Sequence, residues 1–459
     1  MKKIYTLLAA LLVTAGAAAQ NPSAYFMEGT TFRSQFNPAF APLRGYFNIP
    51  ALGGIQVSTG GGLAVDKLLY PRDGRLVTAL DSSVSASEVL SGMKQNNMLG
   101  LDTRVNLIGF GAFTRNHKSF WSVDINLKGN TEFNLPRSLF EFSKQGKEGS
   151  IADLGILSDW YAEIAGSYSF PLLDDKLYVG ARVKFLAGIA RAHINFDRFD
   201  VSLQDERWAI DATGSVDLSL NGAEVSSTER EGREFFEIGD LDFGPKGPAG
   251  YGFAVDLGAT YDILPGLQAS LAVVDLGFIN WGTSNTVSGS LSKNVSYTGV
   301  EVVDGTALPQ PDFDTNLEFE RRTPASMSKM LRATINAGIE YEVWRHKVGV
   351  GLLYSARVWN YKSIHDLVAS VNFHPVRWFT LTGSYSLIVN RGSALGLALN
   401  LCPGGINFFV GTDMLVAKHA KQYMIPIKQR SMNLTFGLGV PMGKRSHRIA
   451  EYIREKDKR

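Results

Sequence analysis

Charged side chains occupy alternate positions of several apolar segments, and they are the residues of this sequence whose placement could do chemistry. In 120–129 (FWSVDINLKG) Asp124 sits between two apolar residues, and Arg182 and Lys184 alternate with apolar residues in the same way. Successive side chains of a β-strand point to opposite faces, so these charges share one face. On that face they would line a polar interior, where they could form ion pairs and hydrogen bonds. The candidates for that surface are Asp124, Arg182, Lys184, Asp275, Arg332 and Glu340.

The titratable residues form no catalytic or metal-binding pattern. Seven histidines are present, most of them in predicted turns or loops, and none belongs to an HExxH motif or another metal-ligand spacing. The sequence contains no G-x-S-x-G nucleophile elbow and no GxxxxGK[ST] phosphate-binding loop. We therefore expect a protein that is not an enzyme and that uses no metal and no cofactor.

Residues 1–19 have the features of a secretory signal peptide. They begin with Lys2 and Lys3, continue with an apolar run and end with three alanines before Gln20. The apolar run is shorter than the roughly 20 residues that a membrane-spanning helix needs. We predict that residues 1–19 are cleaved when the chain is exported by a Gram-negative cell.

Composition narrows the class of the exported chain. Without Lys2 and Lys3 the 46 basic residues become 44, which equals the 44 acidic residues, so the mature chain is formally neutral. A neutral chain has no electrostatic reason to bind nucleic acid. Cys402 is the only cysteine, which excludes an internal disulfide. A large soluble β protein and a closed membrane barrel both fit this composition.

The lengths of the strands and of their connections separate these two classes. Segments such as 176–190 and 331–344 are longer than the usual 5 to 6 or so residues of a soluble strand, and they reach the roughly ten residues that cross a bilayer at a tilt. Short polar or Pro/Gly turns, for example 263–266 and 402–405, alternate with connections that are mostly far longer. Outer-membrane barrels have short turns on the periplasmic side and long loops outside.

The sequence therefore predicts an all-β fold, a transmembrane outer-membrane β-barrel of about 14 antiparallel strands over residues 45–442, with both termini in the periplasm. The segment 193–221 also alternates, and we expect it to be an excursion of the loop after the fifth strand. If it belongs to the wall instead, the barrel has sixteen strands. The predicted wall strands are 45–60, 103–114, 119–131, 158–170, 176–190, 250–262, 267–280, 331–344, 347–361, 365–374, 378–389, 393–402, 405–415 and 430–441.

Two of the long loops and two tryptophans carry further expectations. The loops contain predicted helices at 85–96 and at 136–146, and the second of these opens on a proline and stops at a glycine. Trp121 and Trp281 are predicted interfacial aromatic anchors. For the strand that carries Trp281 a second hypothesis stays open, in which Asp275 faces the lumen and gates a ligand path.

The N-terminal stretch FRSQFNPAFAPLRGYFNIPALGG, residues 32–54, is both apolar and rich in proline. Proline cannot donate a hydrogen bond to a sheet, so 37–50 does not suit a membrane strand. Irregular backbone is tolerated at membrane depth where protein and water surround it, as in the mouth of a barrel. We predict that residues 20–44 form a short hatch, or plug-like segment, inside the lumen.

The tail at residues 443–459 follows the last predicted strand and carries more basic than acidic residues. We expect it to lie in the periplasm as a solvated tail or short helix. The alternative is that it docks a periplasmic protein partner.

These features together resemble the long-chain fatty-acid transporter (FadL-type) superfamily of outer-membrane barrels, and in particular a branch of uncharacterised barrels with the front pattern YFMEGTTFRSQFNPAFAPLRGYFNIPALGG. The resemblance implies a hatch inside the barrel and lateral exit of the substrate through the wall. It also implies that the turn motif Asn37, Pro38, Ala39 and Phe40 forms the transition from hatch to wall.

Two functions follow as hypotheses. The first is uptake or passage of hydrophobic or amphipathic small molecules across the outer membrane, with outer-membrane lipid around the barrel and a hydrophobic small molecule as ligand. The second is a structural or docking role in an outer-membrane secretion or assembly complex. Bound lipid in the lumen favours the first, and a partner lost on removing the tail favours the second.

Overall fold

The computed structural model describes most of the chain between residues 22 and 445. The predicted signal peptide and all but the first residues of the tail lie outside the described residues. The described ranges are 22–27, 29–61, 67, 69–73, 75–79, 81–146, 149–203, 208–243, 246–297, 302–303, 306–307, 317–325, 327–344, 347–358, 363–376, 378–389, 392–413 and 431–445.

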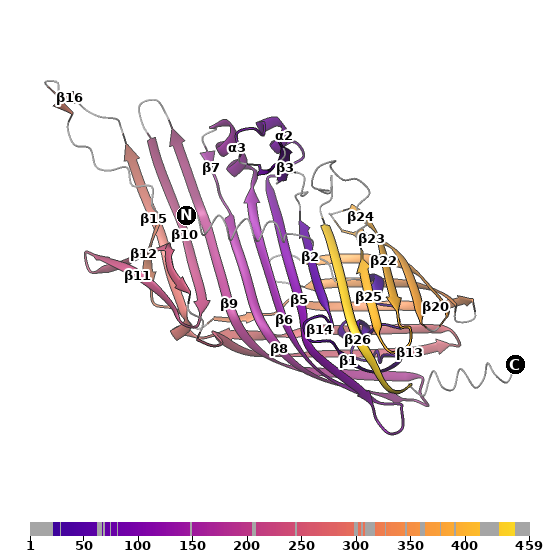
Figure 1. Ribbon diagram of the computed structural model, residues 1–459. Coiled ribbons are helices and arrows are strands. Elements are labelled where there is room, and N and C mark those ends of the chain that lie inside the picture. The colour runs from indigo at the N-terminus through magenta and orange to yellow at the C-terminus, as the bar shows by residue number, and fades with distance from the viewer. Residues whose placement is uncertain are drawn as a thin grey trace.

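Antiparallel strands close into a barrel with fourteen wall positions, as predicted (Figure 1). The seam closes because β26 pairs with both β1 and β2, for example Phe47 with Val440 and Val57 with Leu434. In chain order the wall positions are β1 (Arg44–Asn48) with β2 (Ile55–Gly61), β5 (Asn96–Phe113), β6 (Phe120–Pro136), β8 (Leu154–Leu172), β9 (Leu177–Leu203), β13 (Gly250–Leu264), β14 (Leu267–Trp281), β19 (Met327–Met330) with β20 (Ala333–Trp344), β21 (Val348–Val358), β22 (Ile364–Val376), β23 (Phe379–Ile388), β24 (Gly392–Leu401), β25 (Asn407–Thr412) and β26 (Ser431–Arg445).

The outer surface of the wall is apolar over the membrane-spanning part. On β13 the side chains of Tyr251, Phe253 and Leu257 are more than half exposed, whereas Ala254 and Asp256 between them are buried in the interior. This alternation matches the solvent on each side, because lipid contacts the outer face and protein or water contacts the inner face. Backbone groups in the wall are satisfied by neighbouring strands, as hydrocarbon requires.

The first wall position differs from the predicted continuous strand 45–60. The chain leaves the ladder between β1 and β2, where Pro50 has no N–H to donate and Ala51 has a φ of 60°. The Ala51 N–H donates to the carbonyl of Leu107 at 3.1 Å. The eighth position is also divided, by Leu331 and Arg332 between β19 and β20.

The segment 193–221 is an excursion of the loop after the fifth strand, as predicted, and not part of the wall. β13 pairs directly with the lower part of β9, from Tyr261 against Leu177 to Gly250 against Gly188. At the upper part of β9 the sheet branches, because β9 pairs with β8 as far as Phe196 and also pairs with β10. This branching explains why a strand count from alternation alone was ambiguous. The branch, here called the outer sheet, has the order β9, β10 (Trp208–Leu220), β15 (Thr286–Tyr297), β18 (Glu318–Arg322), β12 (Arg233–Phe243) and β11 (Ala223–Arg230).

This outer sheet curls around a small core of its own. Phe236 of β12 stacks on Phe319 of β18 with ring centroids 6.0 Å apart. Ile194 on β9 and Val225 on β11 pack against the same cluster although they lie at opposite ends of the strand order. The excursion is therefore a self-supporting element on the long-loop side of the barrel.

Both predicted loop helices are present. α3 (Arg137–Gln145) follows Pro136 and ends at Gly146, whose φ of 61° is left-handed. α2 (Ala86–Leu90) is shorter than predicted, because the chain turns at Gly92 with a φ of 79°. Together with β3 (Leu69–Arg72) and β4 (Arg75–Thr78) they form a cap at the top of Figure 1. No helix within the described ranges is long and apolar enough to cross a membrane.

Candidate lumenal site

The described N-terminal residues 22–27 and 29–43, here called the hatch, lie inside the barrel. They contain two short 3-10 helices, η1 (Pro22–Ala24) and η2 (Thr31–Gln35). The Ser23 N–H donates to Asp413 Oδ1 at 2.7 Å, beyond β25, while the Tyr25 hydroxyl lies 3.0 Å from the Ser270 hydroxyl on β14. Because β14 and β25 are nearly opposite each other in the wall order, the hatch extends across the lumen.

The hatch has an aromatic core. Tyr25 makes edge contacts with Phe26 and Phe40, at centroid distances of 4.9 and 5.1 Å. Arg33 is buried above the ring of Phe40, with its guanidinium carbon 4.1 Å from the centroid, and its Nε donates to the Tyr25 carbonyl at 2.9 Å. Phe32 reaches the wall at Phe409, 5.0 Å away. The apolar side chains that first marked this stretch therefore pack against one another and against the wall.

The Asn-Pro-Ala-Phe motif forms a turn that is seated on two wall strands. Asn37 Oδ1 accepts the Ala39 N–H at 2.9 Å, which closes the turn. Asn37 Nδ2 points to the Ala259 carbonyl on β13 at 3.2 Å. A Cβ at Gly258 would lie 2.0 Å from Asn37 Oδ1, and one at Gly180 would lie 2.3 Å from the Pro38 carbonyl carbon. Only glycine lets the two strands approach the turn this closely.

A set of charged residues lies in the lumen next to the hatch, and we call it the ionic network. Lys184 Nζ lies 2.6 Å from Asp256 Oδ1 and 2.6 Å from Asp275 Oδ1. Lys128 Nζ lies 2.7 Å from Glu163 Oε2 and 3.0 Å from Asp275 Oδ1. The network consists of Asp124, Lys128, Glu163, Arg182, Lys184, Asp256 and Asp275.

Hatch and ionic network meet at Arg182. One of its guanidinium nitrogens lies 3.3 Å from Asp124 Oδ2 and 3.5 Å from the Ser34 hydroxyl of the hatch. Asp124 also accepts a hydrogen bond from the Tyr46 hydroxyl at 3.4 Å. The two regions thus form one continuous filling of the barrel.

A β-bulge turns Asp275 into this network. Val255 pairs with Leu276 and Leu257 pairs with Val273, so two residues of β14, Val274 and Asp275, face a single residue of β13. Asp275 has a φ of 59°, which is uncommon for a residue other than glycine. Its backbone N–H donates to Asp256 Oδ1 at 2.7 Å. The strained backbone is therefore held by a hydrogen bond within the network.

The same bulge makes the prediction for Trp281 wrong. By simple alternation Trp281 would share the outer face with Leu271, which is 56% exposed. The additional residue inverts the alternation, and Trp281 is only 1% exposed, in contact with Tyr161 and Ile279. Trp281 is thus a lumenal side chain and not an interfacial anchor. Trp121 lies on the outer face, 38% exposed and 5.3 Å from Phe110.

The remaining predicted residues lie in the interior at two different levels. Glu340 is at the hatch, with its Oε2 4.0 Å from a guanidinium nitrogen of Arg33. Arg332 lies on the long-loop side of the ionic network, with nitrogens 3.1 Å from Asp102 and 3.0 Å from Glu132. The six candidate charges therefore share the interior but do not form one cluster.

Sequence reasoning missed several residues of this interior. Lys128 and Glu163 were not selected, although Lys128 continues the same alternation as Asp124 and Glu163 stands among apolar residues of β8. Arg33 and Tyr25 of the hatch were also missed, because an irregular segment has no periodicity from which burial can be inferred.

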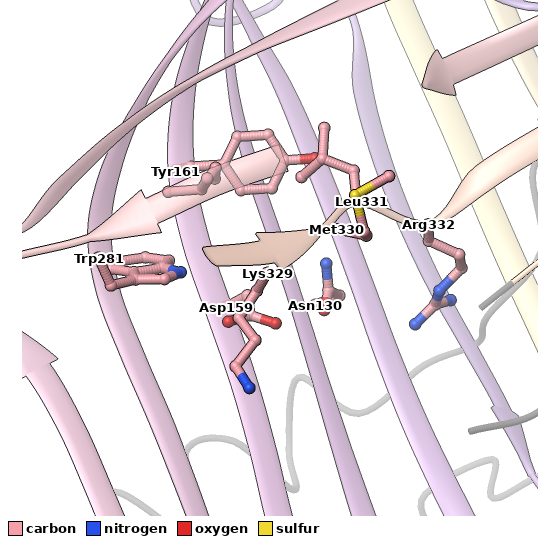
Figure 2. Close-up of a pocket in the computed structure, with 9 residues that line it drawn as sticks. Asn130, Asp159, Tyr161, Trp281, Lys329, Met330, Leu331 and Arg332 are labelled. Carbon is pink, nitrogen blue, oxygen red and sulfur yellow. The ribbon is translucent and has the colours of Figure 1, made fainter. Parts of the chain in front are cut away.

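Figure 2 shows a pocket in the lumen that is lined by residues of β6, β8, β14 and β19 and of the link between β19 and β20. It is open to solvent, and its volume with that open space included is about 340 Å³. Aromatic and aliphatic groups line one part of it and polar groups the other, as Figure 2 shows for the rings of Tyr161 and Trp281 and the guanidinium of Arg332. The lining residues are Asn130, Asp159, Tyr161, Ile279, Trp281, Lys329, Met330, Leu331 and Arg332. Across the described residues no three His, Cys, Asp or Glu side chains are grouped so as to hold a metal ion.

Comparison with protein families assigns the chain to a family. The model described as "Family of unknown function (DUF5723)" matches residues 38–413. The chain belongs to this family. Its match begins inside the hatch at Pro38 and includes wall strands up to the end of β25. No curated protein matches the sequence of this chain.

Comparison with solved structures finds membrane transporters at low sequence identity. The Ralstonia pickettii toluene transporter TbuX is 11% identical, with a TM-score of 0.45 over 95% of this chain and 99% of that chain. The P. putida toluene transporter TodX is 11% identical, with a TM-score of 0.38 over 93% and 94%. A Pseudomonas aeruginosa FadL homologue is 10% identical, with a TM-score of 0.41 over 93% and 95%.

The family match confirms the expectation that the chain belongs to an uncharacterised family. At these identities and TM-scores the solved structures decide neither a superfamily nor a substrate, and the FadL-type likeness remains a resemblance.

Proposed function

We propose that this protein passes hydrophobic or amphipathic small molecules across the outer membrane of a Gram-negative cell. The observation that carries the proposal is the pocket lined by Tyr161, Ile279 and Trp281, which lies in the lumen beside buried charged side chains. Ligand sites are typically apolar concavities with a few placed polar groups.

The hatch supports the same proposal, because it occupies the route between the pocket and the short-turn rim. Its contacts with the wall are mostly uncharged, for example Asn336 Nδ2 to the Phe36 carbonyl at 3.0 Å and Asn407 Nδ2 to the Gly29 carbonyl at 3.0 Å. Each such hydrogen bond contributes only about 0.5 to 1.5 kcal/mol net, since water replaces it when the hatch moves. A segment held in this way suits a removable barrier.

The test is uptake by proteoliposomes that contain the mature protein. We expect a fluorescent fatty acid or a small aromatic hydrocarbon to enter faster than in protein-free liposomes, and glucose to enter at the protein-free rate. A chain lacking residues 22–40 should admit the hydrophobic compound faster still. Equal rates for all compounds with and without protein would refute the proposal.

A pocket variant provides the internal control. Trp281→Ala removes the largest apolar group of the pocket and should lower hydrophobic uptake, whereas Trp121→Ala removes the same side chain from the outer face and should leave it unchanged. Native mass spectrometry should find bound lipid or hydrocarbon in the wild type and less of it in Trp281→Ala.

A further inference from the structure

Two arginines on one side of the lumen reach two carboxylates on the other. Arg332, between β19 and β20, has nitrogens 3.1 Å from Asp102 on β5 and 3.0 Å from Glu132 on β6. Arg357 on β21 has a nitrogen 3.8 Å from the same Asp102. Asp102 is therefore shared by two arginines from different strands.

The strands that carry these side chains are opposite each other in the wall. β5 and β6 hold the second and third of the fourteen positions, and β20 and β21 hold the eighth and ninth. No ladder joins β5 or β6 to β20 or β21 among the described strands. The ion pairs therefore cross the lumen, unlike the pair between Arg191 and Asp159, which joins neighbouring strands.

A circular barrel would be too wide for such contacts. Fourteen strands about 4.8 Å apart and tilted by about 40° enclose a circle about 28 Å across. An Arg and an Asp in contact hold their Cα atoms at most about 14 Å apart. The two sides of the barrel are therefore closer together at this level than in a circular barrel.

We propose that Arg332, Arg357, Asp102 and Glu132 form an ionic clasp that holds the two sides of the lumen together and closes the pocket toward the long-loop side. Arg332 is both a member of the clasp and a lining residue of the pocket. Arg357 is also anchored on its own side, 3.6 Å from Asp366 on β22, so it presents its charge in a fixed direction. The clasp regulates the pocket of the proposed function and takes its biological meaning from that function.

The physical basis is the partial burial of these charges. Arg332 and Glu132 are about 15% exposed or less, Arg357 is 6% exposed, and the shared Asp102 is 28% exposed. Separating partly buried partners leaves each charge incompletely solvated, so the closed form is favoured until water or a solute replaces the contacts. Opening the clasp breaks three contacts: Arg332 with Asp102, Arg332 with Glu132, and Arg357 with Asp102. They break together because Arg332 and Asp102 each take part in two of them.

The test measures access to the pocket and needs no transport. In a Cys402→Ser background, Ile279→Cys places one thiol in the lining of the pocket, where the native side chain is 2% exposed. Its rate of modification by membrane-impermeant methanethiosulfonates is measured in detergent and in liposomes. We expect the double variant Arg332→Gln with Arg357→Gln to react roughly ten times faster, which corresponds to about 1.4 kcal/mol in the free energy of opening.

Reagents of both signs are required. Loss of two positive charges alone would attract a cationic reagent and repel an anionic one, whereas an opened clasp accelerates both. Arg230→Gln is the matched control, because Arg230 pairs with Glu318 in the outer sheet and not across the lumen. Arg332→Lys keeps the charge but cannot bridge two carboxylates as a fork, so its rate should be intermediate.

Unchanged rates for both reagents in the double variant, with heat-modifiable migration showing a folded barrel, would overturn the proposal. A fast rate in the wild type would overturn it as well. Uptake by the same variants separates the two ideas. If the double variant is labelled faster but no variant takes up the hydrophobic compound, the clasp stands and the passage of small molecules is refuted. If uptake occurs but labelling of the double variant is unchanged, the clasp alone is refuted.

Discussion

The lumen is filled by two regions that use different chemistry. The hatch binds the wall through aromatic packing and mostly uncharged hydrogen bonds. Charged groups take part in three of its contacts, which are Arg33 with Glu340, Ser23 with Asp413 and Ser34 with Arg182. The ionic network binds β6, β8, β9, β13 and β14 through charges that are almost fully buried. Removing one partner from a buried charge pair is strongly destabilising, whereas separating neutral groups into water is not. The comparison indicates that the network is a fixed part of the wall and that the hatch is the part able to move.

The largest expected effect is on the network. Glu163→Ala leaves Lys128 and Lys184 with less negative charge around them in the interior, and should lower the free energy of unfolding by about 3 to 5 kcal/mol. Urea unfolding of the barrel in lipid nanodiscs measures it. Glu141→Ala on α3 removes a partly exposed carboxylate whose partner, Arg137, stays solvated, and serves as the control. A loss of stability no larger than that of the control would remove the distinction between the two regions.

A bulky residue under the hatch should displace the hatch and spare the barrel. Gly258→Val introduces a Cβ into the position of Asn37 Oδ1, and overpacking of this kind costs about 1 to 3 kcal/mol. We expect faster protease cleavage within residues 22–43 and higher conductance in planar bilayers, with little change in barrel unfolding. Gly383→Val is the matched control, since a Cβ there meets nothing within 4 Å. Cooperative loss of the whole barrel in Gly258→Val would show that the hatch is not separable from the wall.

A single neutral contact of the hatch should matter less. Tyr25→Phe removes the hydroxyl that meets Ser270, and Ser270 keeps its hydrogen bond to the Gly338 carbonyl at 3.2 Å. We expect a loss of about 1 kcal/mol in hatch binding, measured by the protection of hatch amides from hydrogen exchange. A loss several times larger would mean that the hatch depends on few strong contacts and not on many weak ones.

The smallest effect should come from an ion pair outside the lumen. Lys118 and Asp175 lie 2.5 Å apart and connect two short turns, but each side chain is about one-third exposed. Lys118→Ala should change the free energy of unfolding by less than about 1 kcal/mol. If Lys118→Ala lost as much stability as Glu163→Ala, burial would not be the property that distinguishes the ionic network from other ion pairs.

The barrel could be predicted from sequence because bilayer crossing imposes long alternating strands and unequal connections. The number of wall positions followed from these two features, and the helix at 137–145 followed from Pro136 and Gly146. Trp281 could not be assigned in the same way, because the bulge at Asp275 inverts the alternation and a bulge leaves no periodic signal. The sequence pattern identified charges that face inward, but the pairing of Arg332 with Asp102 depends on the closer approach of the two sides of the barrel, which alternation does not encode.

The hatch has a thermodynamic consequence for the seam between the first and last strands. Its contacts reach Gly180 on β9, Gly338 on β20 and Gly437 on β26, and all of them exist together only when β26 has joined β1 and β2. A ligand that binds the closed barrel and not the open one stabilises the closed barrel. The N-terminal segment is therefore an intramolecular ligand of the closed ring, and each contact that retains it in the lumen also opposes separation of the chain's two ends.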